Sequence, residues 1–284
     1  GEGHVLVSGA GSQWQNSGRI NIAHGGIGSL TVSDGATVSS NEASIGLGAT
    51  GQGEVLLTSG AAWTVAEQFT VGWSGHGVIE IEDGAQLTSG KGIVGTTAGG
   101  VGSVLVTGSG STWTITDQNL VLGLAGTGSM TIEDGALVSV RDGVDLGVSG
   151  ASANGALVLR GTLGSRGTLE TSQITGGIGT ADLTIDGGVL RATTDTAAFF
   201  ETYGNQSVLI GAAGGFIDTN GHDIGIAPEL TGAGALTKQG AGKLTLTGAN
   251  SFAGGTIIEA GVLELGDGGT SGSILGNVAN DGVL

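Results

Sequence analysis

The segment GHGVIEIEDGAQLTSGKGIVGTTAG, residues 75–99, is one copy of a repeat that fills the first half of the chain. Each copy has a Gly-x-Gly turn, an alternating apolar run such as residues 78–82, a Gly/Ser/Asp turn and two further short apolar runs. Period-two alternation is typical of strands, and this repeat length is typical of a solenoid in which each copy forms one turn. The sequence therefore predicts an all-β solenoid of about 25 residues per turn. The copies begin, at intervals of 24 to 26 residues, at Gly1, Gly26, Gly51, Gly75, Gly100 and Gly126.

Superposition of the six copies aligns their apolar residues in columns. Residues two apart on a strand share a face, so we expect two columns of the first run and one of the last run to point inward. The first run gives the inward pairs Val5/Val7, Leu30/Val32, Val55/Leu57, Ile79/Ile81, Val104/Val106 and Met130/Ile132. The last run gives Ile22, Ile45, Val71, Val94, Leu122 and Leu146. The residues between the first pairs, expected to face outward, are Leu6, Thr31, Leu56, Glu80, Leu105 and Thr131.

A second pattern repeats every two copies. A large residue next to a smaller one lets stacked layers interdigitate, and a carboxylate on every second turn avoids a ladder of like charges. Both alternations indicate that the copies are stacked, and so does the opposite-charge pair that the register forms between Arg19 and Glu42. Odd copies carry Trp14, Trp63 and Trp113, where even copies carry Val38, Leu87 and Val138. Even copies carry Asp34, Asp83 and Asp134, where odd copies carry Gly9, Ser59 and Gly108.

Composition excludes several classes of protein. The 284 residues include 62 Gly and one Pro, but Gly does not recur at every third position, so collagen is excluded. A formal charge of −17 argues against nucleic acid or an anionic membrane as the partner. The chain has no Cys, so it can form neither a disulfide nor a thiolate metal site. We find no apolar run of membrane-spanning length and no signal peptide, and we expect the sequence to be a piece of a longer chain.

The regular repeat does not extend along the whole chain. We expect one β-helix over 1–284, with regular turns in 1–150, irregular turns with an insertion in 151–226, and a third type of repeat in 227–284. Residues 195–203 are expected to leave the coil as a short helix or loop, because Thr194 or Asp195 can cap a helix from Ala197 onward. That excursion is expected to pack Phe199, Phe200 or Tyr203 against the side of the coil.

The third type of repeat resembles a known family. The phrase LTKQGAGKLTLTGANSFAGGTIIEAGVLELGDGG, residues 236–269, is similar to the autotransporter-associated β-strand repeat of type V secretion passenger domains. The resemblance implies a right-handed parallel β-helix of the pertactin and AIDA kind, exported through a C-terminal β-barrel that this sequence does not include. It also implies a location at the Gram-negative cell surface, with the passenger either displayed or released.

Candidate catalytic and metal residues fit structural roles better. His4, His24, His76 and His222 lie near no Gly-x-Ser-x-Gly elbow, which argues against a hydrolase triad. The pairs Glu82-Asp83 and Glu133-Asp134 recur with the turn, unlike a single catalytic pair. Gly176–Asp182 places its Asp one position late for a calcium nonapeptide. We therefore expect no catalytic residue, metal site or cofactor.

A binding surface is the more open possibility, and its ligand-binding residues stay unassigned. One variable column follows the inward residue of the last run by two positions, and Trp73 beside His76 is suited to stacking on a sugar. Its apolar character and its parity instead favour a core position, and we expect Trp14, Trp63 and Trp113 to fill buried layers in the same way. The column contains His24, Leu47, Trp73, Thr96, Leu124 and Val148.

These observations predict a non-catalytic passenger segment that acts as an adhesin or a self-association module. The expected partners are a host cell surface, the extracellular matrix, a glycan or another copy on a neighbouring bacterium. The first alternative is a stalk that projects and helps to fold a separate functional domain. A carbohydrate-active enzyme is the weakest alternative, because the eight Lys and Arg residues are scattered and do not converge on one face.

Overall fold

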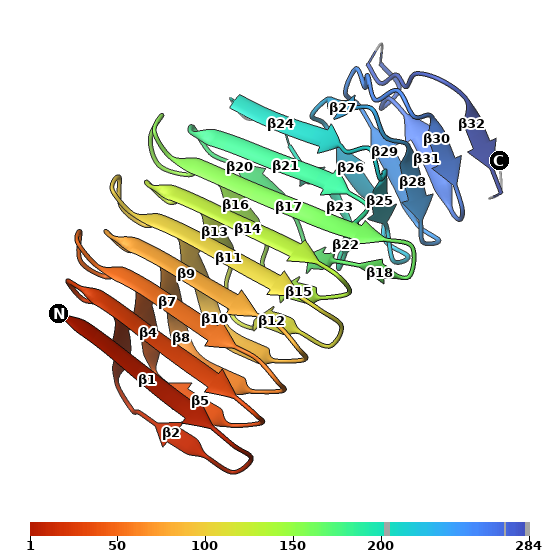
Figure 1. The fold of residues 1–284 in the computed structure, drawn as a ribbon. Helices are drawn as coiled ribbons and strands as arrows, with labels where there is room; N and C mark the ends of the chain where they lie inside the picture. Colours follow the sequence, from red (N-terminus) through yellow and green to blue (C-terminus); the bar gives the residue numbers. More distant parts are fainter. Residues whose placement is uncertain (202–204, 270, 282–284) are drawn as a thin grey trace.

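The computed structural model describes residues 1–201, 205–269 and 271–281 of the chain. In these residues the protein is an all-β parallel solenoid without helices, and its described ends lie at opposite ends of the stack (Figure 1). No helix in this described part is therefore long and apolar enough to cross a membrane. The predicted fold class is confirmed.

Each turn contributes strands to three faces of the solenoid. The first face is a ladder of β1 (Glu2–Ser8), β4 (Ile27–Ser33), β7 (Gln52–Leu57), β9 (His76–Ile81), β11 (Val101–Thr107), β14 (Thr127–Glu133), β17 (Asn154–Thr162), β21 (Thr180–Asp186), β24 (Asn205–Ile210) and β27 (Leu230–Gly232). The second face contains β2 (Gln13–Gln15), β5 (Thr37–Ser40), β12 (Thr112–Ile115), β15 (Leu137–Val140), β19 (Thr168–Thr171), β22 (Val189–Ala192), β25 (Gly215–Asp218), β28 (Leu236–Gln239), β30 (Thr256–Ile258) and β32 (Val278–Asn280). The third face contains β3 (Arg19–Ile22), β6 (Glu42–Ile45), β13 (Leu120–Leu122), β16 (Val144–Leu146), β20 (Ile174–Gly176), β23 (Thr196–Phe200), β26 (Ile224–Ile226), β29 (Lys243–Leu246) and β31 (Val262–Leu265). The long strands β8 (Ala62–Val71) and β10 (Gln86–Val94) run through the second and third faces and join them.

The register of the ladders confirms the predicted columns. On the first face Val5 pairs with Leu30, and the pairing continues through Val55, Ile79 and the equivalent residues of later turns. Leu30, Val55 and Ile79 are at most 1% exposed. Val5 in the first turn is 42% exposed because a neighbouring turn covers it on one side only. The column of the last run also pairs as predicted, from Ile22 to Leu146. Apolar burial along the axis of the coil is therefore the main stabilising contribution.

The two-turn alternation of Trp and aliphatic residues is also present. Leu87 pairs with Trp63 on one side and with Trp113 on the other, and both Trp side chains are fully buried. Phe69 lies between them, with ring centroids 5.4 Å from Trp63 and 5.7 Å from Trp113, both in edge-to-face geometry. Each indole N–H donates to a serine hydroxyl of the preceding turn, of which Ser89 is one. Trp63 and Trp113 therefore fill buried layers, as predicted, whereas Trp14 in the first turn is only partly buried.

Two columns of glycine interlock at the corner between the third and first faces. A Cβ on Gly102 would lie 2.3 Å from the carbonyl oxygen of Val71 and 2.6 Å from Cγ1 of Val94. Gly72 has a φ of +70°, and a Cβ there would lie 2.2 Å from the carbonyl oxygen of Val101. A side chain has little room between these backbones, which explains why the Gly102 column is glycine in all six regular turns. The Gly72 column is glycine in five of them, and in the first turn it is Ala23, which also has a left-handed φ.

The alternating aspartates have a conformational role in addition to avoiding a ladder of like charges. Asp34 and Asp83 adopt left-handed φ angles of 58° and 51° at the corner after the first face. Asp and Asn tolerate this region better than most residues do. Each carboxylate also accepts a hydrogen bond from a neighbouring turn, from Ser8 Oγ to Asp34 at 2.7 Å and from Thr58 Oγ1 to Asp83 at 3.3 Å. The aspartates therefore join adjacent turns at this corner.

The predicted helical excursion at residues 195–203 is wrong where the structure describes it. Thr196–Phe200 form strand β23, which contains a bulge: Thr196 pairs with Ile224 and Phe200 pairs with Ile226. Phe199 and Phe200 are at most 1% exposed and belong to the core, so they do not pack on the side of the coil. Burial of both rings outweighs the local helix-capping signal. Tyr203 lies outside the described residues.

The last turns are shorter and carry buried polar side chains. Leu236 pairs with Thr256, an interval of 20 residues. Lys238 is fully buried, and its Nζ donates to Thr219 Oγ1 at 3.0 Å and to backbone carbonyls of Gln239, Gly240 and Ala260 at 2.6 to 3.0 Å.

Asn250 makes a similar set of contacts in the same region. Its Oδ1 accepts from the N–H of Leu230, and its Nδ2 donates to the carbonyls of Gly248 and Ser273. Both side chains therefore bond to the turn before and the turn after their own.

Candidate functional site

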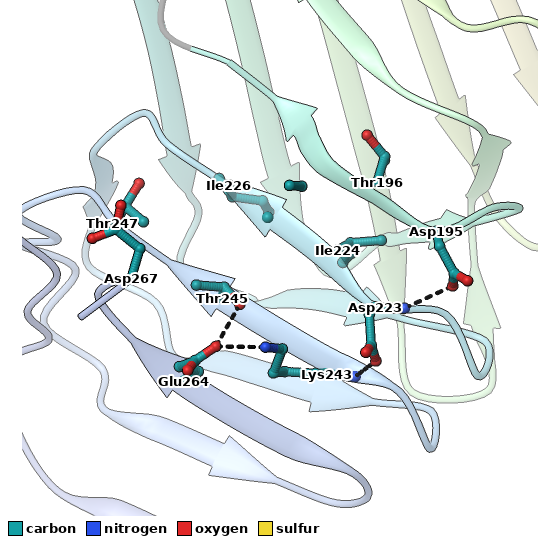
Figure 2. A pocket seen from close by; sticks show the side chains of 12 residues that line it. Asp195, Thr196, Asp223, Ile224, Ile226, Lys243, Thr245, Thr247, Glu264 and Asp267 are labelled. Atoms are coloured by element: carbon teal, nitrogen blue, oxygen red, sulfur yellow. Dashed lines mark hydrogen bonds and ion pairs between the residues drawn. The ribbon is translucent and has the colours of Figure 1, made fainter. Parts of the chain in front are cut away.

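A groove of about 710 Å³ lies on the third face near the C-terminal end of the solenoid. Strands β23, β26, β29 and β31 form it, and Figure 2 shows its polar side chains. Its charged lining consists of Asp195, Asp223, Lys243, Glu264 and Asp267. This groove combines a sizeable volume with several charged side chains, so it is the first candidate site.

The hollow results from the irregular pairing of β23. Between its two paired residues, Thr196 and Phe200, β23 has three residues where β26 has only Gly225. Gly225 lies in the floor, and a Cβ there would be 2.2 Å from the carbonyl oxygen of Ala197. The neighbouring Thr245 on β29 is also small. Small residues beside a bulge therefore leave a recess in a face that is otherwise regular.

The carboxylates of the groove bond mainly within the protein. Asp195 Oδ1 accepts from the backbone N–H of Asp223 at 3.0 Å, and Asp223 Oδ1 accepts from the backbone N–H of Lys243 at 2.8 Å. The first of these bonds, followed by that from His222, lowers the pKa of Asp195 below its ordinary value. Lys243 Nζ lies 2.8 Å from Glu264 Oε2. These carboxylates therefore hold successive turns together.

The charged side chains of the groove are bonded to their neighbours and are not grouped around a metal position. Among the described residues, no group of three or more His, Asp and Glu side chains is placed to hold a metal ion. The carboxylates are bonded to backbone, lysine, histidine or hydroxyl groups, as in the Thr245 Oγ1 to Glu264 bond of 3.0 Å. Such an arrangement is suited to weak recognition of polar groups at the surface.

We expect the Lys243→Met variant to raise the pKa of Glu264 toward its ordinary value. The hydrogen bond from Lys243 is the largest cause of the lowered pKa of Glu264, and the bond from Thr245 is the second. A lowered folded-state pKa stabilises the fold above the unfolded pKa, and that contribution is lost as the pH falls through the folded pKa. NMR titration of the Glu264 carboxyl carbon measures the change, with Thr245→Val as the matched control giving a smaller rise. An unchanged pKa in Lys243→Met contradicts the assignment.

The variable corner column predicted from the sequence is not part of the core. Its apolar members, such as Leu47 and Leu124, are half-buried, and His24 is exposed. The guanidinium of Arg19 lies 5.6 Å from the centroid of the Trp73 ring, and it also donates from Nε to Glu42 Oε2 at 2.6 Å. The predicted Arg19–Glu42 pair is therefore confirmed, and Trp73 is partly covered by that arginine.

The candidate histidines fall into two regions of the solenoid: His4 lines surface hollows with His24 and with His76, whereas His222 lies far along the coil. His4 bonds to Ser29, and His222 to Asp195, in turns far apart along the coil. Asp182 accepts a hydrogen bond of 2.6 Å from Ser207 Oγ. Each residue thus bonds to a neighbouring turn. The second carboxylate pair behaves similarly, since Glu133 Oε2 lies 3.7 Å from Arg160 Nη1 of the next turn.

A second candidate surface is the outward side of the first face. One column of this face alternates between aliphatic residues on odd turns and mainly threonine on even turns. We call this column the stripe, and its first and last aliphatic members, Leu6 and Leu209, are 68% and 41% exposed. The sequence revealed its first six members but not that the alternation continues. In order the stripe is Leu6, Thr31, Leu56, Glu80, Leu105, Thr131, Val158, Thr184, Leu209 and Thr231.

The fold and these surfaces define the chain as a parallel β-solenoid that presents long faces to its surroundings. Residues 236–265 match the Passenger-associated-transport-repeat family. The chain is also 28% identical over 125 residues to the Adhesin BmaC autotransporter of Brucella suis biovar 1 (strain 1330), a match that covers 44% of this chain and 4% of that protein. No solved structure matches the chain. The repeat, the relative and the solenoid together support an autotransporter passenger domain, as the resemblance implied.

Proposed function

We propose that this chain is a non-catalytic adhesive segment of an autotransporter passenger, displayed outside the Gram-negative outer membrane. The observation that carries the proposal is the first face, where the stripe extends over ten strands with half-buried or exposed aliphatic side chains. Long apolar and polar columns on a rigid surface are suited to binding another extended surface. The relative's printed name, an adhesin, supports the same function.

The proposal is tested by displaying the segment on beads. Beads that carry this chain are expected to adhere to host cells, to matrix-coated plates or to each other, whereas uncoated beads are not. The matched variant replaces Leu56, Leu105 and Val158 with threonine, a β-branched residue that is favourable in strands and already occupies the alternate positions of the stripe. Adhesion that is equal for the variant and the original chain contradicts the assignment to the first face, and absence of adhesion for the original contradicts the adhesive function.

A structural stalk is the second candidate function. It is favoured by the buried side chains of Lys238 and Asn250. Their hydrogen bonds join successive turns and offer no surface to a ligand. Inert beads together with loss of display of a longer passenger when residues 236–265 are deleted would support the stalk. Glycan turnover by the purified chain, abolished by one acidic substitution, would instead support a carbohydrate-active enzyme.

A further inference from the structure

The stripe on the first face is a regular relief with a period of two turns. Neighbouring strands are about 4.8 Å apart, so the aliphatic side chains recur about every 9.6 Å along the solenoid. Between them lie the shorter threonines, and Glu80 takes one of those places. A partner that fits this relief must have side chains of the same spacing, and the chain itself has them.

We propose that the first face binds the first face of a second copy in antiparallel orientation. This inference rests on the proposed adhesive function and names its partner. The two-fold axis runs parallel to the strands, so that the contact is isologous. The face has ten strands, so full overlap places the first strand opposite the tenth and the fifth opposite the sixth. Because ten is an even number, every aliphatic turn then faces a threonine or Glu80 turn. Leu105, for example, lies opposite Thr131 of the second copy.

The charges beside the stripe favour this orientation at one pair of positions and oppose it at another. Glu82 directly follows the fourth strand, β9, and Arg160 lies in the same column on the seventh strand, β17. Antiparallel overlap places each Glu82 opposite Arg160 of the other copy. It also places Glu54 opposite Asp182, which are like charges. With a charge of −17 on each copy, association is therefore expected to strengthen as salt rises.

The area of the face is sufficient for a stable dimer. Ten strands about 4.8 Å apart, each about 20 Å long, give a surface on the order of 900 Å² per copy. A typical specific interface buries about 800 Å² per partner. Faces of two sheets pack about 10 Å apart, which leaves room for one layer of interdigitated leucine and threonine side chains.

Cross-linking tests the orientation directly, because the chain has no native cysteine. A mixture of the Leu105→Cys and Thr131→Cys variants, treated with a short bismaleimide, is expected to give a mixed dimer. The Leu6→Cys variant alone is the control, because antiparallel overlap places the two Leu6 positions at opposite ends of the dimer. Efficient self-linking of Leu6→Cys, or no mixed dimer from the first pair, overturns the proposal.

A charge exchange gives a second, independent test by light scattering with size-exclusion chromatography. Glu82→Arg is expected to weaken the dimer about tenfold, since it places two arginines opposite each other. The double variant with Arg160→Glu is expected to restore it. Asp117→Arg, which makes the same charge change at an exposed site on another face, is the control and should leave affinity unchanged. Equal behaviour of Glu82→Arg and Asp117→Arg overturns the proposal.

The two levels of the proposal can fail separately. A chain that is monomeric in these assays but coats beads that bind host cells or matrix keeps the adhesive function and loses the second copy as partner. A chain that dimerises while its beads bind neither cells nor matrix is a self-association module. A monomeric chain on inert beads contradicts both.

Discussion

Replacing Lys238 with methionine is expected to lower the free energy of unfolding of the C-terminal turns by about 4 kcal/mol. Lys238 is fully buried, and its ammonium supplies N–H donors to one hydroxyl and three carbonyl oxygens in three successive turns. Methionine keeps most of the volume but donates nothing, and a buried acceptor without a partner costs about 1–3 kcal/mol. The total stays below the sum because carbonyl oxygens have a second lone pair.

Hydrogen exchange of the amides in residues 236–265 measures this loss locally. The four Trp residues lie at or before position 113, so their fluorescence reports the early turns and should be unchanged. Lys243→Met removes a half-buried lysine of the same repeat and is the control, with a much smaller effect. Equal protection of the amides in both variants would contradict a stabilising role for the hydrogen bonds of Lys238.

The pH dependence of the same turns follows from the burial of Lys238. Desolvation lowers the pKa of Lys238 to about 8, below its ordinary value of 10.5. Between these two values the unfolded chain binds the proton more than the folded chain does, so stability rises as the pH rises through this range. Lys238→Met removes the titrating group. Hydrogen exchange of this variant should therefore show no such rise of stability with pH.

The second large effect is expected for Gly102→Ala, which should cost about 3 kcal/mol. The new Cβ would meet the Val71 carbonyl oxygen at 2.3 Å, and the backbones at this corner have no free space to move into. Gly99→Ala is the matched control three residues away, because its nearest atom would be 3.6 Å from the new Cβ. Urea unfolding followed by Trp fluorescence measures both. If Gly102→Ala is as stable as Gly99→Ala, the prediction is wrong, and the backbones at this corner can move apart to admit a methyl group.

Sequence reasoning predicted the features that repeat. The inward columns, the Trp and aliphatic alternation and the Arg19–Glu42 pair follow from a fixed period, because a residue in one turn determines its neighbours in the next. The corner column was misassigned for a local reason. A glycine of positive φ, such as Gly72, separates Val71 from Trp73, so the inside-outside alternation of the strand does not continue to Trp73.

The groove could not be predicted because it depends on a single departure from the repeat. Its depth arises from three residues of β23 opposite Gly225, and neither strand alone reveals that count. The pair Phe199-Phe200 was visible in the sequence, but its local context favoured a helix. Only the pairing with β26 shows that both rings enter the core.

The alternation of tryptophan layers also restricts how the length of this protein can change. Removing residues 75–99 alone would bring the layer of Trp63 directly onto that of Trp113, two large rings where the packing has space for one. Removing two consecutive copies would leave large and small layers in their original order. The packing of the interior is thus kept when the solenoid is shortened or extended by two copies at a time. Changes in length, whether engineered or by recombination, are therefore expected in steps of about fifty residues.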